Sequence, residues 1–221
     1  MHPECLSRDG RRTLAALKDP VHAHGFVLAG GTALALQLGH RISEDLDFFS
    51  AAPFSTDALY REMKSRRLSP SVLQEAEGTL TVNAAGIKVS FFHHPYPFVG
   101  KLLHVRGIPL ASTTDIASMK AIAVSQRGAR RDFIDLFFIL RDTPFRKVAE
   151  NMVTRYGAAR ISPVQIGKSL VFFDDAESDP DPRYRGKGPD WESVKRFFRR
   201  NVRQMVLDLE AAHSDEVSPP G

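Results

Sequence analysis

The sequence predicts a mixed α/β (α+β) fold. A small mixed sheet forms its first part, and an α-helical region follows. Residues 71–110 carry short apolar runs separated by glycine turns, whereas residues 112–211 carry apolar side chains spaced by three and four. We therefore expect a first domain at residues 12–110 and a helical region at residues 111–211. At 221 residues the chain is long enough to bury a full core.

The composition excludes several classes of protein. The single cysteine, Cys5, rules out an internal disulfide framework and a cysteine-based zinc site. No stretch approaches the roughly 20 apolar residues of a membrane span, and the first residues lack the plan of a signal peptide, so we expect a cytoplasmic protein without a membrane partner.

The charge is mildly basic, with a formal net charge of +4. Basic residues cluster twice, and such clusters are compatible with a nucleic-acid partner but also with a solvated helix face. The clusters are Arg127, Arg130 and Arg131, and Lys195, Arg196, Arg199, Arg200 and Arg203.

The first elements place a glycine turn between a strand and a helix. Leu14, Leu17 and Val21 have helical spacing, and the apolar run at residues 26–29 suits a buried strand. Gly30 and Gly31 follow, and Thr32 opens a helix that ends near Gly39. Glycines let backbone N–H groups approach an anion, and a helix N-terminus favours negative charge, so this arrangement is typical of phosphate binding.

An acidic strand follows at residues 45–49. Its period of two places Asp45 and Asp47 on one face, while Leu46 and Phe48 enter the core. Two carboxylates on one face beside a phosphate site are suited to a divalent metal, Mg²⁺ or Mn²⁺, on a nucleoside triphosphate (NTP).

The remaining elements are expected in two groups. A helix begins at the Ser55 cap and ends near residue 67, and strands are expected at residues 72–73, 79–83, 87–92 and 102–109, with Pro109 ending the last strand or confining it to an edge. Helices are expected from residue 112 to 128, 130 to 141, 145 to 156, 163 to 173 and 190 to 211. A loop or linker at residues 174–189 and a disordered tail at residues 212–221 complete the chain.

Two blocks of sequence resemble a known family. The glycine pair followed by Asp-x-Asp resembles the minimal nucleotidyltransferase signature, and the whole string from Gly30 to Phe49 resembles the AbiEii/AbiGii toxin family of nucleotidyltransferase-fold proteins. The block from Met119 to Phe138, with a helix lysine, an arginine-rich turn and an Asp-x-x-Asp segment, resembles the same family. The resemblance implies a nucleotidyltransferase fold whose helical region completes the active-site cleft.

The second block supplies further candidate residues. Lys120 and Arg127 are two helical turns apart and share a face, where they would clamp a triphosphate. Asp132 and Asp135 share a face of the next helix, and either would act as base or both would orient Lys120 and Arg127. A salt-bridge network between the two helices is the structural alternative. Ser43, just before the acidic strand, is included among the nucleotide-binding candidates with Gly30, Gly31 and Thr32.

One position departs from the expected pattern. Nucleotidyltransferase folds place a third carboxylate on a neighbouring strand, and the equivalent position here is Ser90. This departure puts the second metal and the general base in doubt. We interpret His93 and His94 as a loop, and the phenylalanine-rich stretches as core.

The resemblance implies transfer of a nucleoside monophosphate from an NTP to an acceptor, with an RNA 3′ end, in particular that of tRNA, as the favoured acceptor. It also implies a toxin of a toxin–antitoxin or abortive-infection system, with an antitoxin protein as a partner. Two alternatives stay open: transfer to a small molecule such as an aminoglycoside or to a protein hydroxyl, and a degenerate protein that binds a nucleotide or a partner without catalysis.

Overall fold

The computed structural model describes residues 1–66 and 68–217. The chain divides into two compact units, Met1–Ser112 and Thr113–Gly221. The first unit contains the sheet, and the second is helical in its described part. The prediction of an α/β fold with a mixed sheet followed by helices is confirmed.

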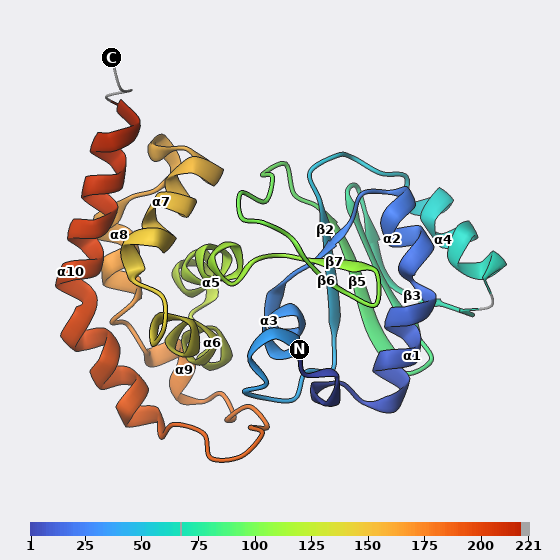
Figure 1. Ribbon diagram of the computed structural model, residues 1–221, viewed down its shortest axis with the longest axis horizontal. Coiled ribbons are helices and arrows are strands. Elements are labelled where there is room, and N and C mark those ends of the chain that lie inside the picture. The colour runs from blue at the N-terminus through green and yellow to red at the C-terminus, as the bar shows by residue number, and fades with distance from the viewer. Residues whose placement is uncertain (67, 218–221) are drawn as a thin grey trace. The chain divides into compact units, whose positions relative to one another are not determined.

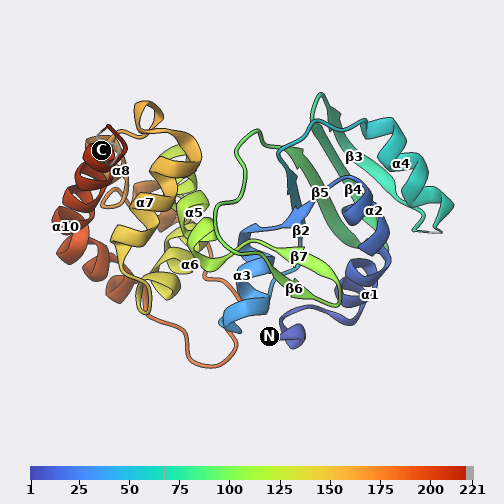
Figure 2. The same ribbon diagram turned by 45° about the horizontal axis from the view of Figure 1, so that its top comes forward.

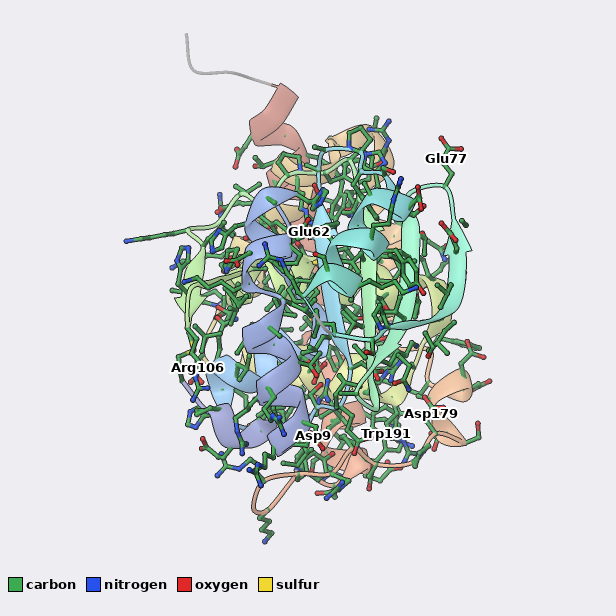
Figure 3. All side chains as sticks on the ribbon, turned by 90° about the vertical axis from the view of Figure 1, so that its right-hand side faces the viewer. Asp9, Glu62, Glu77, Arg106, Asp179 and Trp191 are labelled. Carbon is green, nitrogen blue, oxygen red and sulfur yellow. The ribbon has the colours of Figure 1, made fainter. Side chains whose placement is uncertain are left out.

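The first unit is built on a seven-stranded sheet in the order β3-β4-β5-β2-β1-β7-β6. The pairs β2–β5 and β1–β7 are parallel and the other neighbours are antiparallel. The strands are β1 (Val27–Leu28), β2 (Leu46–Ser50), β3 (Ser71–Ala76), β4 (Thr79–Ala84), β5 (Ile87–His93), β6 (Leu103–Val105) and β7 (Ile108–Leu110). Glu77, labelled in Figure 3, lies in the turn that joins β3 to β4.

Helices lie on both sides of this sheet. Figures 1 and 2 show α1, α2 and α4 on one side and α3 on the other. The helical segments are η1 (Pro3–Cys5), α1 (Arg8–Ala16), α2 (Lys18–Ala23), α3 (Gly30–Leu38) and α4 (Thr56–Ser65). The Ser55 hydroxyl accepts a hydrogen bond from the Ala58 N–H and caps α4.

Alternation along β2 sorts its side chains between a buried and an open face. Leu46 and Phe48 are fully buried, whereas Asp47 and Phe49 are partly exposed. On the buried face the Phe91 ring lies 4.9 Å from Phe26 and 5.3 Å from Phe48 between centroids. This aromatic core fixes the strand register, because a shift of one residue would bury Asp47.

Two elements of the first unit differ from the sequence expectation. Residues 102–109 form a hairpin of β6 and β7 instead of one strand, because Arg106 and Gly107 adopt positive φ values of 51° and 82° and make a tight turn. Pro109 lies inside β7, which is not an edge strand. Leu110 of β7 is the register partner of Leu28 in β1. The first predicted helix is two helices, α1 and α2, joined at Leu17.

The second unit packs its helices around an aromatic cluster. The Phe133 ring lies 5.2 Å from Phe173, 5.8 Å from Trp191 and 5.5 Å from Phe198 between centroids. The helical segments are α5 (Thr113–Arg127), α6 (Arg130–Leu140), α7 (Phe145–Tyr156), η2 (Ala158–Arg160), α8 (Pro163–Ser169), α9 (Asp174–Glu177) and α10 (Trp191–Val217). The Ser162 hydroxyl caps α8 by accepting from the Gln165 N–H.

The acidic segment that begins with α9 is held to the helices by Arg130. Its guanidinium donates to the carbonyls of Ala176 and Glu177 at 3.0 and 2.8 Å. It also lies 4.9 Å from the ring centre of Trp191, and the Arg130 backbone N–H donates to Asp179, which Figure 3 labels near Trp191. Thus a short helix and an anchored stretch occupy part of the predicted loop at residues 174–189.

The last helix, α10, reaches Val217, so residues 212–217 of the predicted tail are helical, and residues 218–221 lie outside the described residues. In the described part of the chain, no helix combines the length and the apolar character needed to cross a membrane.

Candidate active site

The predicted site residues form two groups, one in each unit. In the first unit, Asp47 lies on β2, in the centre of the sheet, and Asp45 lies one residue before the strand. Both side chains are partly exposed, while Leu46 between them is fully buried. Alternation along β2 therefore places Asp47 on the face opposite Leu46 and Phe48, and Asp45 directly precedes the strand.

The first turn of α3 comes close to Asp47. Gly30 has a φ of +66°, and a Cβ added there would lie 3.4 Å from the Asp47 Oδ2. The Ala29 N–H donates to the Asp47 carbonyl at 3.0 Å. α3 begins without a side-chain cap, so the N–H groups of its first turn are not satisfied by a cap. An anion-binding helix end thus lies beside a carboxylate.

Thr32 and Ser43 connect α3 to the segment that enters β2. The Thr32 hydroxyl donates to the Asp45 carbonyl, so it must accept from the Ser43 hydroxyl, which lies at 2.7 Å. Thr32 is 2% and Ser43 8% exposed. These two hydroxyls are therefore engaged in holding the backbone at Asp45.

Ser90 lies where the third carboxylate was expected. It is the register partner of Asp47 across the parallel pair of β2 and β5, and it is buried. Its neighbour on β4 is Thr81, whose hydroxyl donates to the Ser90 hydroxyl at 3.4 Å. The positions beside Asp47 on β5 and β4 therefore carry hydroxyl groups, and neither strand supplies a third carboxylate.

The donor set suits a metal ion carried by a substrate. Among the described residues, no group of three or more His, Cys, Asp or Glu side chains could hold a metal by itself. Mg²⁺ commonly takes one or two protein carboxylates and completes its coordination with phosphate oxygens and water. Asp45, Asp47 and the neighbouring helix end fit that need.

In the second unit, Lys120 lies between two carboxylates. Its Nζ is 2.7 Å from the Asp132 Oδ1 and 2.7 Å from the Asp135 Oδ2. Arg127 places its Nε 2.7 Å from the Asp132 Oδ2 and its Nη2 3.1 Å from the Asp132 Oδ1. Both aspartates are fully buried, Lys120 is buried, and the Arg127 side chain is 55% exposed.

The charges of this cluster balance. Burial works to raise the pKa of Asp132, but the Lys120 ammonium and the Arg127 guanidinium outweigh it and lower the pKa. Two cations thus face two carboxylates in a protected site. The cluster joins α5 to α6 and orients a lysine and an arginine on one side of α5.

Sequence interpretation missed a row of aromatic rings on the open face of the sheet. Phe49 and Phe92, expected in the core, are partly exposed and lie 5.2 Å apart between ring centroids. His94 and Tyr96 continue the row. Phenylalanines on the two faces of a strand look alike in sequence, so only the alternation with Asp47 could have indicated this.

Sequence interpretation also missed a buried polar contact between α5 and α7. Asp115, fully buried at the start of α5, accepts a hydrogen bond from the Asn151 amide at 3.0 Å. Arg155, one turn further along α7, is buried too, and burial lowers its pKa. The hydrogen bond ties α5 to α7.

The basic cluster of α10 is divided by its contacts. Lys195 is buried, and its Nζ lies 2.7 Å from the Glu177 Oε1. The arginines are exposed and share one side of the helix: Arg196, Arg199, Arg200 and Arg203. We call these four residues the arginine stripe.

The glycine turn at the start of α3 and the acidic strand beside it are the pattern that led us to expect a nucleotidyltransferase. Comparison with known families agrees: residues 12–213 match the family described as "Nucleotidyl transferase AbiEii toxin, Type IV TA system". The chain belongs to this AbiEii nucleotidyl transferase toxin family.

Individual relatives span nearly the whole chain. An uncharacterized protein of Aquifex aeolicus, aq_aa25, is 35% identical over 206 residues, which cover 91% of this chain and 98% of the relative. JHP933 from Helicobacter pylori has a similar structure, with a TM-score of 0.57, 18% identity and coverage of 96% and 98% of the two chains. MenT4, a nucleotidyltransferase toxin from Mycobacterium tuberculosis, gives a TM-score of 0.56 at 16% identity, with coverage of 90% and 91%. The fold is that of the nucleotidyltransferases.

Proposed function

We propose that the protein transfers a nucleoside monophosphate from an NTP to an acceptor hydroxyl and releases pyrophosphate. One observation carries the proposal: Asp47 on the central strand β2, with Asp45 directly before that strand, lies beside the first turn of α3, which has no side-chain cap. Membership of the AbiEii family supports the same reaction class.

Asp45 and Asp47 would hold Mg²⁺ or Mn²⁺, and the ion, when bound, would neutralise charge on the phosphates. The backbone N–H groups of Gly30, Gly31 and Thr32 would bind phosphate oxygens. The hydroxyls of Thr32 and Ser43 would serve nucleotide binding indirectly, because they fix the backbone that carries Asp45.

Lys120 and Arg127 would bind the triphosphate. Asp132, held by both cations and with a lowered pKa, is suited to orienting them and is a poor base. We therefore assign proton transfer from the acceptor hydroxyl to Asp135. Asp135 also contacts Lys120, whose Nζ lies 2.7 Å from the Asp135 Oδ2, so the lysine orients this carboxylate.

The favoured acceptor is an RNA 3′ end, in particular that of tRNA. The arginine stripe supports this choice, because exposed guanidinium groups on one helix face bind phosphates of a nucleic acid. As a member of a toxin family of type IV toxin–antitoxin systems, the protein is expected to have an antitoxin partner.

The test is incubation with each labelled NTP, Mg²⁺ and total tRNA. The double variant Asp45→Ala, Asp47→Ala is compared with the parent and with Glu77→Ala, which removes an exposed acid from the same unit. Label on tRNA with the parent and Glu77→Ala, and none with the double variant, is the expected result. Equal labelling by all three proteins would reject Asp45 and Asp47 as the metal site.

A second candidate function is nucleotide binding without transfer, and Ser90 favours it. A buried hydroxyl at the register partner of Asp47 leaves the site one acid short. Saturable, metal-dependent NTP binding with no labelled product on tRNA, aminoglycosides or protein would support this candidate. Label on an aminoglycoside or a protein instead of tRNA would keep the reaction and replace the acceptor.

A further inference from the structure

A row of four aromatic rings lies on the same face of the sheet as Asp47. Phe49 on β2 and Phe92 on β5 are register partners, with ring centroids 5.2 Å apart and planes inclined by 31°. The His94 ring lies 6.0 Å from Phe49, and the Tyr96 ring lies 5.0 Å from His94. We call Phe49, Phe92, His94 and Tyr96 the aromatic row.

The core of the first unit does not account for this row. Phe26, Phe48 and Phe91 fill the other face and are fully buried, whereas all four members of the aromatic row are partly exposed. Aromatic rings left in contact with water on the face that carries Asp47 suggest a ligand.

The row lies within reach of a nucleotide bound at Asp47. Phe49 follows Asp47 by two residues on the same face, a spacing of roughly 7 Å along a strand. A phosphate held at Asp47 and the first turn of α3 would therefore bring the attached nucleoside to the neighbouring rings.

We propose that the aromatic row stacks a nucleobase, either the base of the NTP or a base of the RNA acceptor. This rests on the proposed function, since it uses the phosphate position assigned there. Stacking on aromatic side chains tolerates every base, because each base presents a π-face. The site would therefore add affinity with little base preference.

The test measures binding by the full chain in the presence of Mg²⁺. The variants Phe92→Leu and Tyr96→Leu remove a ring and keep apolar volume, and Phe54→Leu is the matched control, because Phe54 packs 4.9 Å from Phe26 on the buried side. The probes are each NTP, inorganic tripolyphosphate, which has no base, and a short single-stranded RNA.

We expect Phe92→Leu and Tyr96→Leu to weaken binding of the NTP or the RNA by about tenfold or more, with tripolyphosphate unaffected and Phe54→Leu like the parent. Loss for the NTP alone assigns the row to the substrate base, and loss for the RNA alone assigns it to the acceptor. Unchanged affinity for both, or a parallel loss for tripolyphosphate, would show that the row only holds residues 94–102 on the sheet and would overturn the proposal.

The outcome separates this proposal from the proposed function. A parent protein that binds NTP and RNA but transfers no label contradicts catalysis and leaves the stacking result intact. A parent that binds neither ligand contradicts both proposals.

Discussion

At the scale of single residues, one hydroxyl connects the glycine turn with the acidic strand. Thr32 donates to the Asp45 carbonyl and accepts from Ser43, and Thr32 and Ser43 are both buried. A buried hydrogen bond is worth only about 1 kcal/mol net, but an unsatisfied buried partner costs about 1–3 kcal/mol. The placement of Asp45 should therefore depend on this hydroxyl.

Thr32→Val tests that dependence. We expect the free energy of unfolding to fall by about 1–3 kcal/mol, because Ser43 and the Asp45 carbonyl lose their partner without a change of shape. Nucleotide transfer should fall further than stability alone explains. Urea unfolding and the rate of labelling check this, and Thr32→Ser, which keeps the hydroxyl, should retain most activity. Full activity in Thr32→Val would contradict the positioning role.

Asp132 makes the stability of the second unit sensitive to acid. Its folded pKa lies below the ordinary value of 3.8, so ionised Asp132 stabilises the protein above that pH. The contribution declines as the pH falls through the lowered folded pKa. Asp132→Asn removes this stabilising contribution at every pH. It also leaves Lys120 and Arg127 with one negative charge fewer beside them.

We expect Asp132→Asn to lower the free energy of unfolding by about 3 kcal/mol at pH 7, the scale for breaking a buried ion pair. The difference from the parent should shrink below about pH 4. Urea unfolding followed by circular dichroism at pH 7 and below pH 4 measures it. A difference that does not change with pH would show that Asp132 is not ionised in the folded protein.

At the scale of elements, the packing of α8 against α10 depends on one glycine. A Cβ on Gly167 would collide with the Val206 Cγ2 and lie 3.8 Å from the Val202 Cγ2. Alanine is otherwise better than glycine in a helix by up to about 1 kcal/mol. The collision opposes that gain, and overpacking of this kind costs about 1–3 kcal/mol.

Gly167→Ala should therefore lower the melting temperature. Val206→Ala in the same chain makes room for the new methyl group, so the double variant should be more stable than the sum of the single changes predicts. Thermal unfolding of the four proteins in this cycle measures the coupling. Additive effects would show that the two helices separate easily at this point.

Sequence patterns predicted the elements that a single strong local pattern marks. The strand–glycine turn–helix and the acidic strand follow from local chemistry at Gly30 and from alternation around Asp47. The β6–β7 hairpin was missed, because nothing in the apolar pattern marks the positive φ at Arg106. The sequence left two interpretations of Lys120, Asp132 and Asp135 open, a triphosphate site with a base and a salt-bridge network between helices. Spacing along each helix does not show how two helices face each other.

At the scale of the whole molecule, the mild net charge of +4 conceals an uneven distribution. Arg130 and Lys195 contact the acidic segment after α8. The arginine stripe is exposed, although Arg196 lies 3.8 Å from Asp190 and Arg199 lies over the Phe173 ring. The arginine stripe on α10 is thus one exposed group of positive charges that could attract RNA.

Arg200→Gln with Arg203→Gln should weaken binding of single-stranded RNA and reduce its salt dependence. Each lost phosphate contact lowers the slope of log affinity against log salt by about 0.7, so we expect a reduction of about 1.4. Binding titrations at several salt concentrations measure the slope. Arg8→Gln with Arg12→Gln, two exposed residues of α1, is the matched control, and equal slopes in both double variants would contradict the role of α10.

The central position of β2 has a consequence for local opening. Strand β2 is paired on both sides, to β5 and β1, whereas every residue of the edge strand β3 is exposed. Backbone amides of β3 should exchange their hydrogens with solvent early, and those of Leu46 and Phe48 only when the first unit unfolds as a whole. A small molecule aimed at this face of the sheet would then meet Asp47 on a rigid strand, because β2 offers no partly open state for it to bind.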